Sequence, residues 1–151
     1  MALTDGVGVK VLIHTGAASA TTFAAAATVF TQTANVNVAG ANIIAIADVN
    51  GDGLNDLVIT DPGPSGGMAP TVNVLLQDPA NPGQFLAAGS YAAADANEFA
   101  VADINGDGKP DIVVSSGVTH PMQAGVVATN PGVLLQSVTT AGTFGALQDL
   151  P

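Results

Sequence analysis

The sequence predicts an all-β protein made of repeated antiparallel sheets, and three observations support that prediction. One strand core occurs three times, as VLIH from Val11, VLLQ from Val74 and VLLQ from Val133. One acidic loop occurs twice, as DVNGDGLND from Asp48 and DINGDGKPD from Asp103, and a β-branched run follows each copy. Clusters of Gly, Pro, Asn and Asp separate these segments, and no long segment has the apolar period of a helix.

Each repeat is about 55 residues long and carries the signals of four short strands. An alternating segment, NIIAIAD or EFAVAD, precedes the acidic loop, and the runs LVIT and IVVS follow it. The VLLQ core comes next, and then a strand that begins at Phe85 or Phe144. Because VLIH is followed in the same way by Phe23, we expect the alanine-rich residues 22–29 to be strand rather than helix. Four antiparallel strands per repeat are the pattern of a propeller blade.

The repeats divide the chain unevenly. Residues 1–40 are predicted to be the back half of a first blade, residues 41–95 a second blade with an acidic loop, and residues 96–151 a third blade with the other loop. Such an array of about two and a half blades is a partial propeller, and its terminal faces are apolar and alanine-rich. We therefore expect completion by copies of the chain itself, as a homo-oligomer or filament, or by the missing blades of a longer chain.

The acidic loop has the oxygen spacing of a cation site. Side-chain oxygens stand at positions 1, 3, 5 and 9, contributed by Asp48, Asn50, Asp52 and Asp56 in one copy and by Asp103, Asn105, Asp107 and Asp111 in the other. A hard cation such as Ca²⁺ takes six to eight oxygen ligands. Glycines at positions 4 and 6 permit the tight turn and unusual φ angles that bring such side chains together. The sequence therefore predicts two Ca²⁺ sites.

Other acidic motifs fit less well. An EF-hand needs flanking helices and Glu at position 12, where Ile59 and Val114 stand. Dockerin-like loops lead into helices, and thrombospondin-type acidic repeats carry cysteines. The remaining alternative is a pair of metal-free Asn-Gly and Asp-Gly hairpin turns. Three carboxylates per copy favour calcium, because a turn alone does not require them.

Charge and composition exclude several function classes. The net charge is −10, and Lys10 and Lys109 are the only basic residues besides two histidines, so we expect no nucleic-acid partner. Six of the twelve acidic residues lie in the two loops, so much of the acidity serves them. The absence of cysteine excludes a disulfide framework, a thiolate zinc site and a cysteine nucleophile. No stretch approaches the length of a membrane-spanning helix, and the N-terminus lacks the features of a signal peptide, so an export signal is expected elsewhere.

Catalytic candidates are weak. The GPSGG segment at 63–67 matches a hydrolase elbow, but a strand follows it where that elbow needs a helix. His120 with Ser115 and Ser116 is a poor catalytic pair, although their long loop is a candidate for ligand binding. We therefore predict no enzyme. Four other aspartates are expected in turns, namely Asp61, Asp78, Asp95 and Asp149.

Together these residues resemble the FG-GAP/VCBS repeats of integrin-α-like β-propellers. The matching segments are AIADVNGDGLNDLVIT with VNVLLQ and GQF, and AVADINGDGKPDIVVS with GVLLQ and GTF. The resemblance implies that each loop joins the first two strands of a blade and binds Ca²⁺, with backbone carbonyls from Leu54 and Lys109 as further ligands. This chain has too few blades for the roughly seven of such propellers.

The resemblance implies a non-enzymatic, calcium-binding module with a structural, adhesive or self-assembling role, outside the cell or at its surface. The alternative is a fragment of a propeller that binds glycans or degrades polysaccharides, with a glycan or protein ligand on its loops. Sugar-binding sites usually stack aromatic rings on the sugar, and this chain has only Tyr91 and five phenylalanines.

Overall fold

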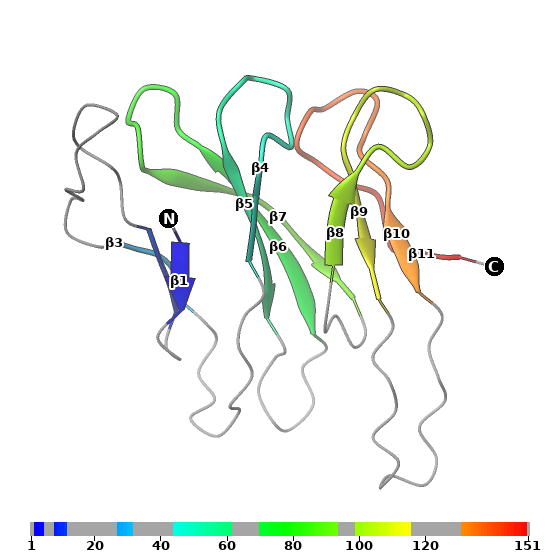
Figure 1. The fold of residues 1–151 in the computed structure, drawn as a ribbon, viewed down its shortest axis with the longest axis horizontal. Helices are drawn as coiled ribbons and strands as arrows, with labels where there is room; N and C mark the ends of the chain where they lie inside the picture. Colours follow the sequence, from blue (N-terminus) through cyan, green and yellow to red (C-terminus); the bar gives the residue numbers. More distant parts are fainter. Residues whose placement is uncertain are drawn as a thin grey trace, which may run out of the picture.

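A computed structural model describes residues 2–4, 8–11, 27–31, 44–61, 70–93, 99–115 and 131–150, and their side chains from Ala45 onward. Every regular element in these residues is a β-strand. The strands form three antiparallel sheets that follow one another in a row, without closing into a ring (Figure 1). The predicted all-β class with four-stranded, blade-like sheets is confirmed. The described residues contain no helix with the length and apolarity needed to cross a membrane.

The first sheet has three strands. They are β1 (Ala2–Thr4), β2 (Gly8–Val11) and β3 (Ala27–Thr31), in that order across the sheet. Strand β3 includes the end of the alanine-rich stretch that the sequence predicts as strand, and residues 22–26 lie outside the described part of the chain. The predicted blade boundaries near residues 41 and 96 also lie outside it.

The second sheet has the four consecutive strands predicted for a blade. They are β4 (Ile44–Ala47), β5 (Asp56–Asp61), β6 (Thr71–Gln77) and β7 (Phe85–Ala92), each paired antiparallel with the next. The β-branched run LVIT forms most of β5, as expected from its propensity. The first acidic loop joins β4 to β5.

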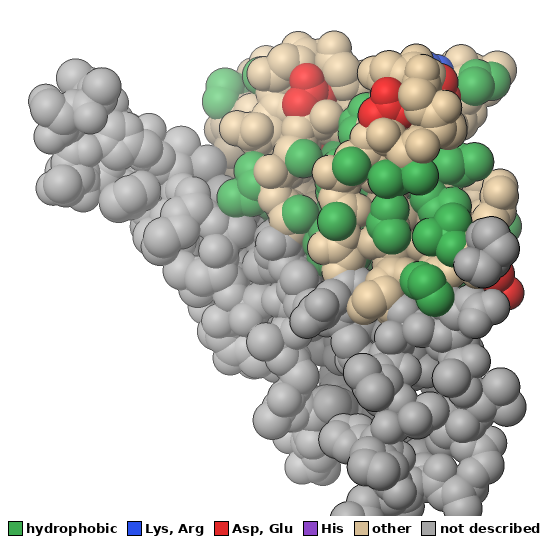
Figure 2. All heavy atoms as spheres, turned by 45° about the vertical axis from the view of Figure 1, so that its right-hand side comes forward, with side chains coloured by type: hydrophobic (Ala, Val, Ile, Leu, Met, Phe, Trp, Pro, Cys, Tyr) green, Lys and Arg blue, Asp and Glu red, His purple; other side chains and the backbone are tan. Residues whose placement is uncertain are grey.

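The third sheet repeats this order in shorter strands. They are β8 (Phe99–Ala102), β9 (Asp111–Val114), β10 (Gly132–Leu134) and β11 (Gln148–Asp149). The strand predicted to begin at Phe144 is reduced to a single bridge between Phe144 and Gln136, and regular pairing resumes only at β11. The second acidic loop joins β8 to β9. Both acidic loops lie at the same end of their sheets (Figure 1), and acidic side chains are exposed there (Figure 2).

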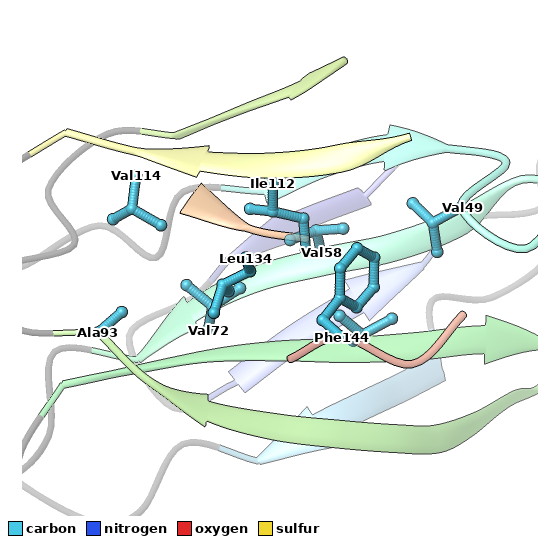
Figure 3. Close-up of a cluster of buried hydrophobic side chains, with 9 residues drawn as sticks. Val49, Val58, Val72, Ala93, Ile112, Val114, Leu134 and Phe144 are labelled. Atoms are coloured by element: carbon cyan, nitrogen blue, oxygen red, sulfur yellow. The ribbon is translucent and has the colours of Figure 1, made fainter. Parts of the chain in front are cut away.

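One cluster of buried hydrophobic side chains lies between the second and third sheets (Figure 3), and Leu57, Ile59 and Leu75 are buried on the opposite face of the second sheet. Val58, Val72 and Val74 project from one sheet, and Ile112, Val114 and Leu134 project from the other. Alternation of side chains along each strand makes this possible, because every second residue faces the neighbouring sheet. Most buried side chains are aliphatic and Phe144 is the one aromatic among the buried core residues, as the composition predicts.

Polar contacts also join these two sheets. The Phe144 N–H donates to the Tyr91 hydroxyl over 2.9 Å, and the two rings meet edge to face with centroids 5.7 Å apart. The buried Gln136 side chain donates through Nε2 to the carbonyl of Val49 in the second sheet and to that of Pro110, 3.0 Å away, in its own sheet. These bonds fix the register of one sheet on the other, whereas apolar packing is less directional.

Two of the predicted turn aspartates are in strands. Asp61 is the buried last residue of β5 and pairs with Thr71, and Asp149 lies in β11 opposite Gly132. Cross-strand pairing outweighs the turn preference of aspartate at these positions. Asp78 is a turn residue as predicted, since its carboxylate accepts from the Ala80 N–H at 2.9 Å and from Asn81 Nδ2 at 2.7 Å. Other sequence candidates lie outside the described residues, namely Asp95, Ser116, His120 and the 63–67 segment.

Candidate metal-binding loops

The first acidic loop folds its polar side chains back onto its own backbone. Asp48 Oδ1 accepts from the N–H groups of Gly51 at 2.7 Å and Asp52 at 3.2 Å, and Asp48 Oδ2 accepts from the Gly53 N–H at 2.8 Å. Asn50 Oδ1 accepts from the Asp52 N–H, also at 2.8 Å. Local bonds of this kind from Asp and Asn stabilise successive turns. The side chains at positions 1, 3 and 5 therefore gather on one short, exposed loop.

The second loop repeats these bonds almost atom for atom. Asp103 Oδ1 accepts from the Gly106 N–H at 2.7 Å, and its Oδ2 accepts from the Gly108 N–H at 2.9 Å. Asn105 Oδ1 accepts from the Asp107 N–H at 2.8 Å, and Asp107 Oδ1 accepts from the Lys109 N–H at 2.9 Å. Two sequences that share their polar and glycine positions thus reach the same local structure in two sheets.

The glycines at positions 4 and 6 take the left-handed backbone conformation that the spacing predicts. The φ angles are +81° at Gly51 and +84° at Gly53, and +78° at Gly106 and +83° at Gly108. An added Cβ would meet no atom within 4 Å at any of the four. The requirement for glycine is therefore a backbone requirement and not one of space.

The aspartate at position 9 has a different environment from the other three side chains. Asp56 is fully buried, and it accepts from the Val49 N–H through Oδ2 and from the Gln77 N–H through Oδ1, both at 2.9 Å. It thereby ties the start of the loop to the third strand of its sheet. Burial raises the pKa of Asp56, the two backbone bonds oppose that rise, and the negative charges of Asp52 and Asp48 add to it.

Asp111 makes the equivalent pair of bonds in the third sheet. It is fully buried and accepts from the Ile104 N–H at 3.1 Å and from the Gln136 N–H at 2.9 Å. The sequence analysis predicts position 9 as a metal ligand. In the structure its carboxylate also accepts two backbone N–H groups, which connect the loop to a strand or its end in the same sheet. A carboxylate has about four lone-pair sites, so two backbone bonds leave acceptor capacity.

The donor atoms predicted for each loop are all oxygen, which suits a hard cation such as Ca²⁺. The structure places positions 1, 3 and 5 on one loop with Leu54 or Lys109, and position 9 is the buried first residue of the strand that follows. Within the described ranges, no group of three or more Asp, Glu or His side chains is gathered at metal-binding distance. The two ligand sets therefore stay a prediction that agrees with the donor chemistry.

The two loops differ in what covers them. In the first loop Val49 is 0% exposed in the core between the sheets, and the turn at Gly142 lies against Asn50, whose Cβ is 3.2 Å from where a Cβ on Gly142 would stand. In the second loop the equivalent residue, Ile104, is 50% exposed. There the Lys109 ammonium donates to the Ser137 carbonyl at 3.2 Å.

Gln136 is the residue whose role the sequence did not reveal. Its repeat equivalent is Gln77, and both residues end a VLLQ core. The recurrence of a polar residue at this position was the feature of the sequence that could have pointed to a role for Gln136. The structure shows that Gln136 bridges the backbones of both acidic loops, through Val49 and Pro110.

A comparison with protein families found one match. The family model described as the FG-GAP-like repeat matches residues 48–114, a span that contains both acidic loops and the whole of the second sheet from β5 onward. Searches of curated proteins and of solved structures found no significant match to the chain.

Proposed function

We propose that this chain is a non-enzymatic, calcium-stabilised module of β-propeller type with a structural or adhesive role outside the cell, a proposal supported by the match of residues 48–114 to the FG-GAP-like repeat. FG-GAP repeats are typically non-catalytic modules, which supports the first part of this proposal. The extracellular part of the proposal rests on the proposed calcium role, because Ca²⁺ sites in extracellular modules are matched to millimolar concentrations.

One observation carries the calcium proposal: two separate loops share the same oxygen spacing and the same internal hydrogen bonds. Asp48 and Asp52 in one loop, and Asp103 and Asp107 in the other, accept hydrogen bonds from backbone amides of their own loop. Turns do not require this concentration of negative charge, which is unfavourable without a nearby positive charge. A cation would relieve the repulsion in both loops.

Bound calcium would stabilise the loop that connects the first two strands of each four-stranded sheet. The residues that would hold it in the first loop are Asp48, Asn50, Asp52 and Asp56, with the carbonyl of Leu54. Those of the second loop are Asp103, Asn105, Asp107 and Asp111, with the carbonyl of Lys109. Two Ca²⁺ ions, with two charges each, would change the formal charge from −10 to −6. Binding to the folded state alone would stabilise it in proportion to the logarithm of Ca²⁺ concentration.

Isothermal titration calorimetry with CaCl₂ tests the proposal. We expect two sites in the wild-type chain, one in Asp52→Ala, one in Asp107→Ala and none in the double variant. Asp78→Ala is the matched control, because Asp78 is an aspartate in a turn outside the two loops and should leave both sites intact. No binding heat up to several millimolar Ca²⁺, or loss of binding in Asp78→Ala, contradicts the proposal.

A further inference from the structure

Each acidic loop contains an asparagine that is directly followed by a glycine, at positions 3 and 4. The pairs are Asn50 with Gly51 and Asn105 with Gly106. The amide carbon of an asparagine side chain can be attacked by the backbone nitrogen of the next residue, with loss of ammonia. Glycine favours this reaction, because it has no Cβ beside the attacking nitrogen and its backbone turns freely. The two pairs are therefore candidate sites of covalent modification.

The fold of the second loop places the two reacting atoms in one small ring. Asn105 Oδ1 accepts from the Asp107 N–H at 2.8 Å, and the ring closed by this bond contains both the Asn105 Cγ and the Gly106 nitrogen. The side chain is thus folded over the peptide with which it reacts. The Gly106 N–H donates to Asp103 Oδ1 at 2.7 Å, and the equivalent bond in the first loop has the same length. This bond therefore does not distinguish the two pairs.

The pair in the first loop is anchored to the third sheet. Asn50 is half-buried, and its Cβ is 3.2 Å from where a Cβ on Gly142 would stand. The preceding residue, Val49, is 0% exposed, and its carbonyl accepts from Gln136. Ring closure must turn the peptide that follows the asparagine, so it needs a local opening of the loop. Such an opening costs more free energy where buried contacts must be broken first.

The pair in the second loop is held less firmly. Asn105 is exposed, and the preceding residue, Ile104, is 50% exposed. This loop also contacts the segment that follows β10, but it does so through Lys109 and Pro110, at positions 7 and 8. The peptide after Asn105 can therefore turn without breaking a buried contact.

We propose that Asn105 is a site of spontaneous deamidation and that it reacts before Asn50. The Gly106 nitrogen bonds to the Asn105 Cγ and loses its proton to solvent. The bond from Cγ to Nδ2 breaks, and Nδ2 takes a proton from solvent and leaves as ammonia. Water then opens the cyclic succinimide at either of its two carbonyls, which leaves aspartate or isoaspartate. The proposal goes beyond the calcium-stabilised module proposed above and does not depend on metal in either loop.

Both products change the second loop. Aspartate adds a negative charge at position 3, and isoaspartate adds a methylene group to the backbone of the loop. Each product also lacks the Asn105 Nδ2 group, which donates to Asp107 Oδ2 at 3.2 Å. We therefore expect chemical ageing to alter the second loop while the first loop keeps its structure.

Peptide mapping by mass spectrometry tests the inference on the 151-residue chain aged in EDTA at about pH 8. We expect Asn105 to convert at least about fivefold faster than Asn50, because its loop opens at lower cost, and to yield isoaspartate among its products. Asn81 is the internal reference: it is also exposed, but Pro82 follows it, and a proline nitrogen has no proton to lose. Conversion of Asn105 no faster than that of Asn50 or Asn81, or without isoaspartate, overturns the inference.

A matched pair of variants assigns the reaction in the intact chain. Asn105→Gln and Asn50→Gln each keep an amide but lengthen the side chain, so the nitrogen of the next residue would have to close a six-membered ring, which forms far more slowly. Ammonia release should lose its fast phase in Asn105→Gln and keep it in Asn50→Gln. A fast phase that persists in Asn105→Gln contradicts the assignment. Circular dichroism checks the fold of both variants, and the map of the wild-type chain does not depend on them. Calcium binding measured by calorimetry is a separate readout, so either proposal can fail alone.

Discussion

Replacing Asp56 with alanine tests whether the buried aspartate at position 9 holds the acidic loop against its sheet. The carboxylate of Asp56 receives the Val49 and Gln77 N–H groups, each at 2.9 Å. Alanine accepts neither, and the Val49 amide lies in a residue that is 0% exposed, where water cannot replace the lost acceptor. We therefore expect the free energy of unfolding to fall even when no metal is present.

The magnitude follows from the two amides. A buried donor left without a partner costs about 1–3 kcal/mol, so the buried Val49 N–H and the part-buried Gln77 N–H together cost at most about 6 kcal/mol. Removal of a buried carboxylate returns part of its desolvation penalty, which places the expected loss near about 3 kcal/mol. Asp111→Ala should cost less, about 1–2 kcal/mol, because one of its partners, the Ile104 N–H, belongs to a residue that is 50% exposed and can bond to water.

Urea unfolding in EDTA at pH 7, followed by circular dichroism, measures these losses. Asp52→Ala is the control, because Asp52 is exposed and accepts the Leu54 N–H at the loop surface, and it should cost under about 1 kcal/mol. The expected order of destabilisation is Asp56→Ala, then Asp111→Ala, then Asp52→Ala. If Asp56→Ala costs no more than Asp52→Ala, the buried carboxylate does not anchor the loop.

Two further predictions concern pH and the contact between sheets. Because burial raises the pKa of Asp56, the proton-linked part of its contribution to stability is fully present below its unfolded pKa and is lost as pH rises through the folded value, while its two hydrogen bonds to backbone N–H groups remain. The EDTA-treated wild type should therefore lose more stability than Asp56→Ala between about pH 4 and pH 7 in urea unfolding, and equal slopes would contradict the raised pKa. Gln136→Leu keeps the side-chain size but removes the donors to the carbonyls of Val49 and Pro110, so it should lower the unfolding free energy by about 1–3 kcal/mol in calorimetry. Gln148→Leu, at an exposed position of β11, should change it by less than about 0.5 kcal/mol, and similar losses in the two variants would refute the bridging role.

The strands beside the acidic loops could be predicted because local pattern and tertiary packing agree there. The β-branched runs that became β5 and β9 favour strands intrinsically, and glycine and asparagine at fixed positions predict the turn between the strands. The prediction was wrong at Asp61, where pairing with Thr71 decides the conformation. The sequence also gave no reason to expect that the strand at Phe144 shortens to one bridge.

The candidate site could be predicted in its local part and not in its tertiary part. The bonds of positions 1, 3 and 5 are made within the loop, so residue type and spacing suffice to predict them. The bonds of position 9 and of Gln136 connect residues far apart in sequence, such as Asp56 with Gln77 and Gln136 with Val49. Spacing alone does not distinguish an aspartate that binds a cation from one that binds backbone amides, because both tasks need an inward-facing carboxylate.

The first acidic loop contacts both its own sheet and the third sheet. The conformation of the loop is therefore coupled to the packing of the two sheets. Val49 is the point of coupling: its N–H is bound by Asp56, its carbonyl by Gln136 of the next sheet, and its side chain packs in the core. A perturbation that disorders the first loop must therefore disturb the contact between sheets, and the converse also holds. In the second loop the Ile104 N–H is bound by Asp111, but its side chain is 50% exposed. The same nine-residue sequence pattern thus takes part in a contact between sheets at Val49, whereas its second residue is half exposed at Ile104.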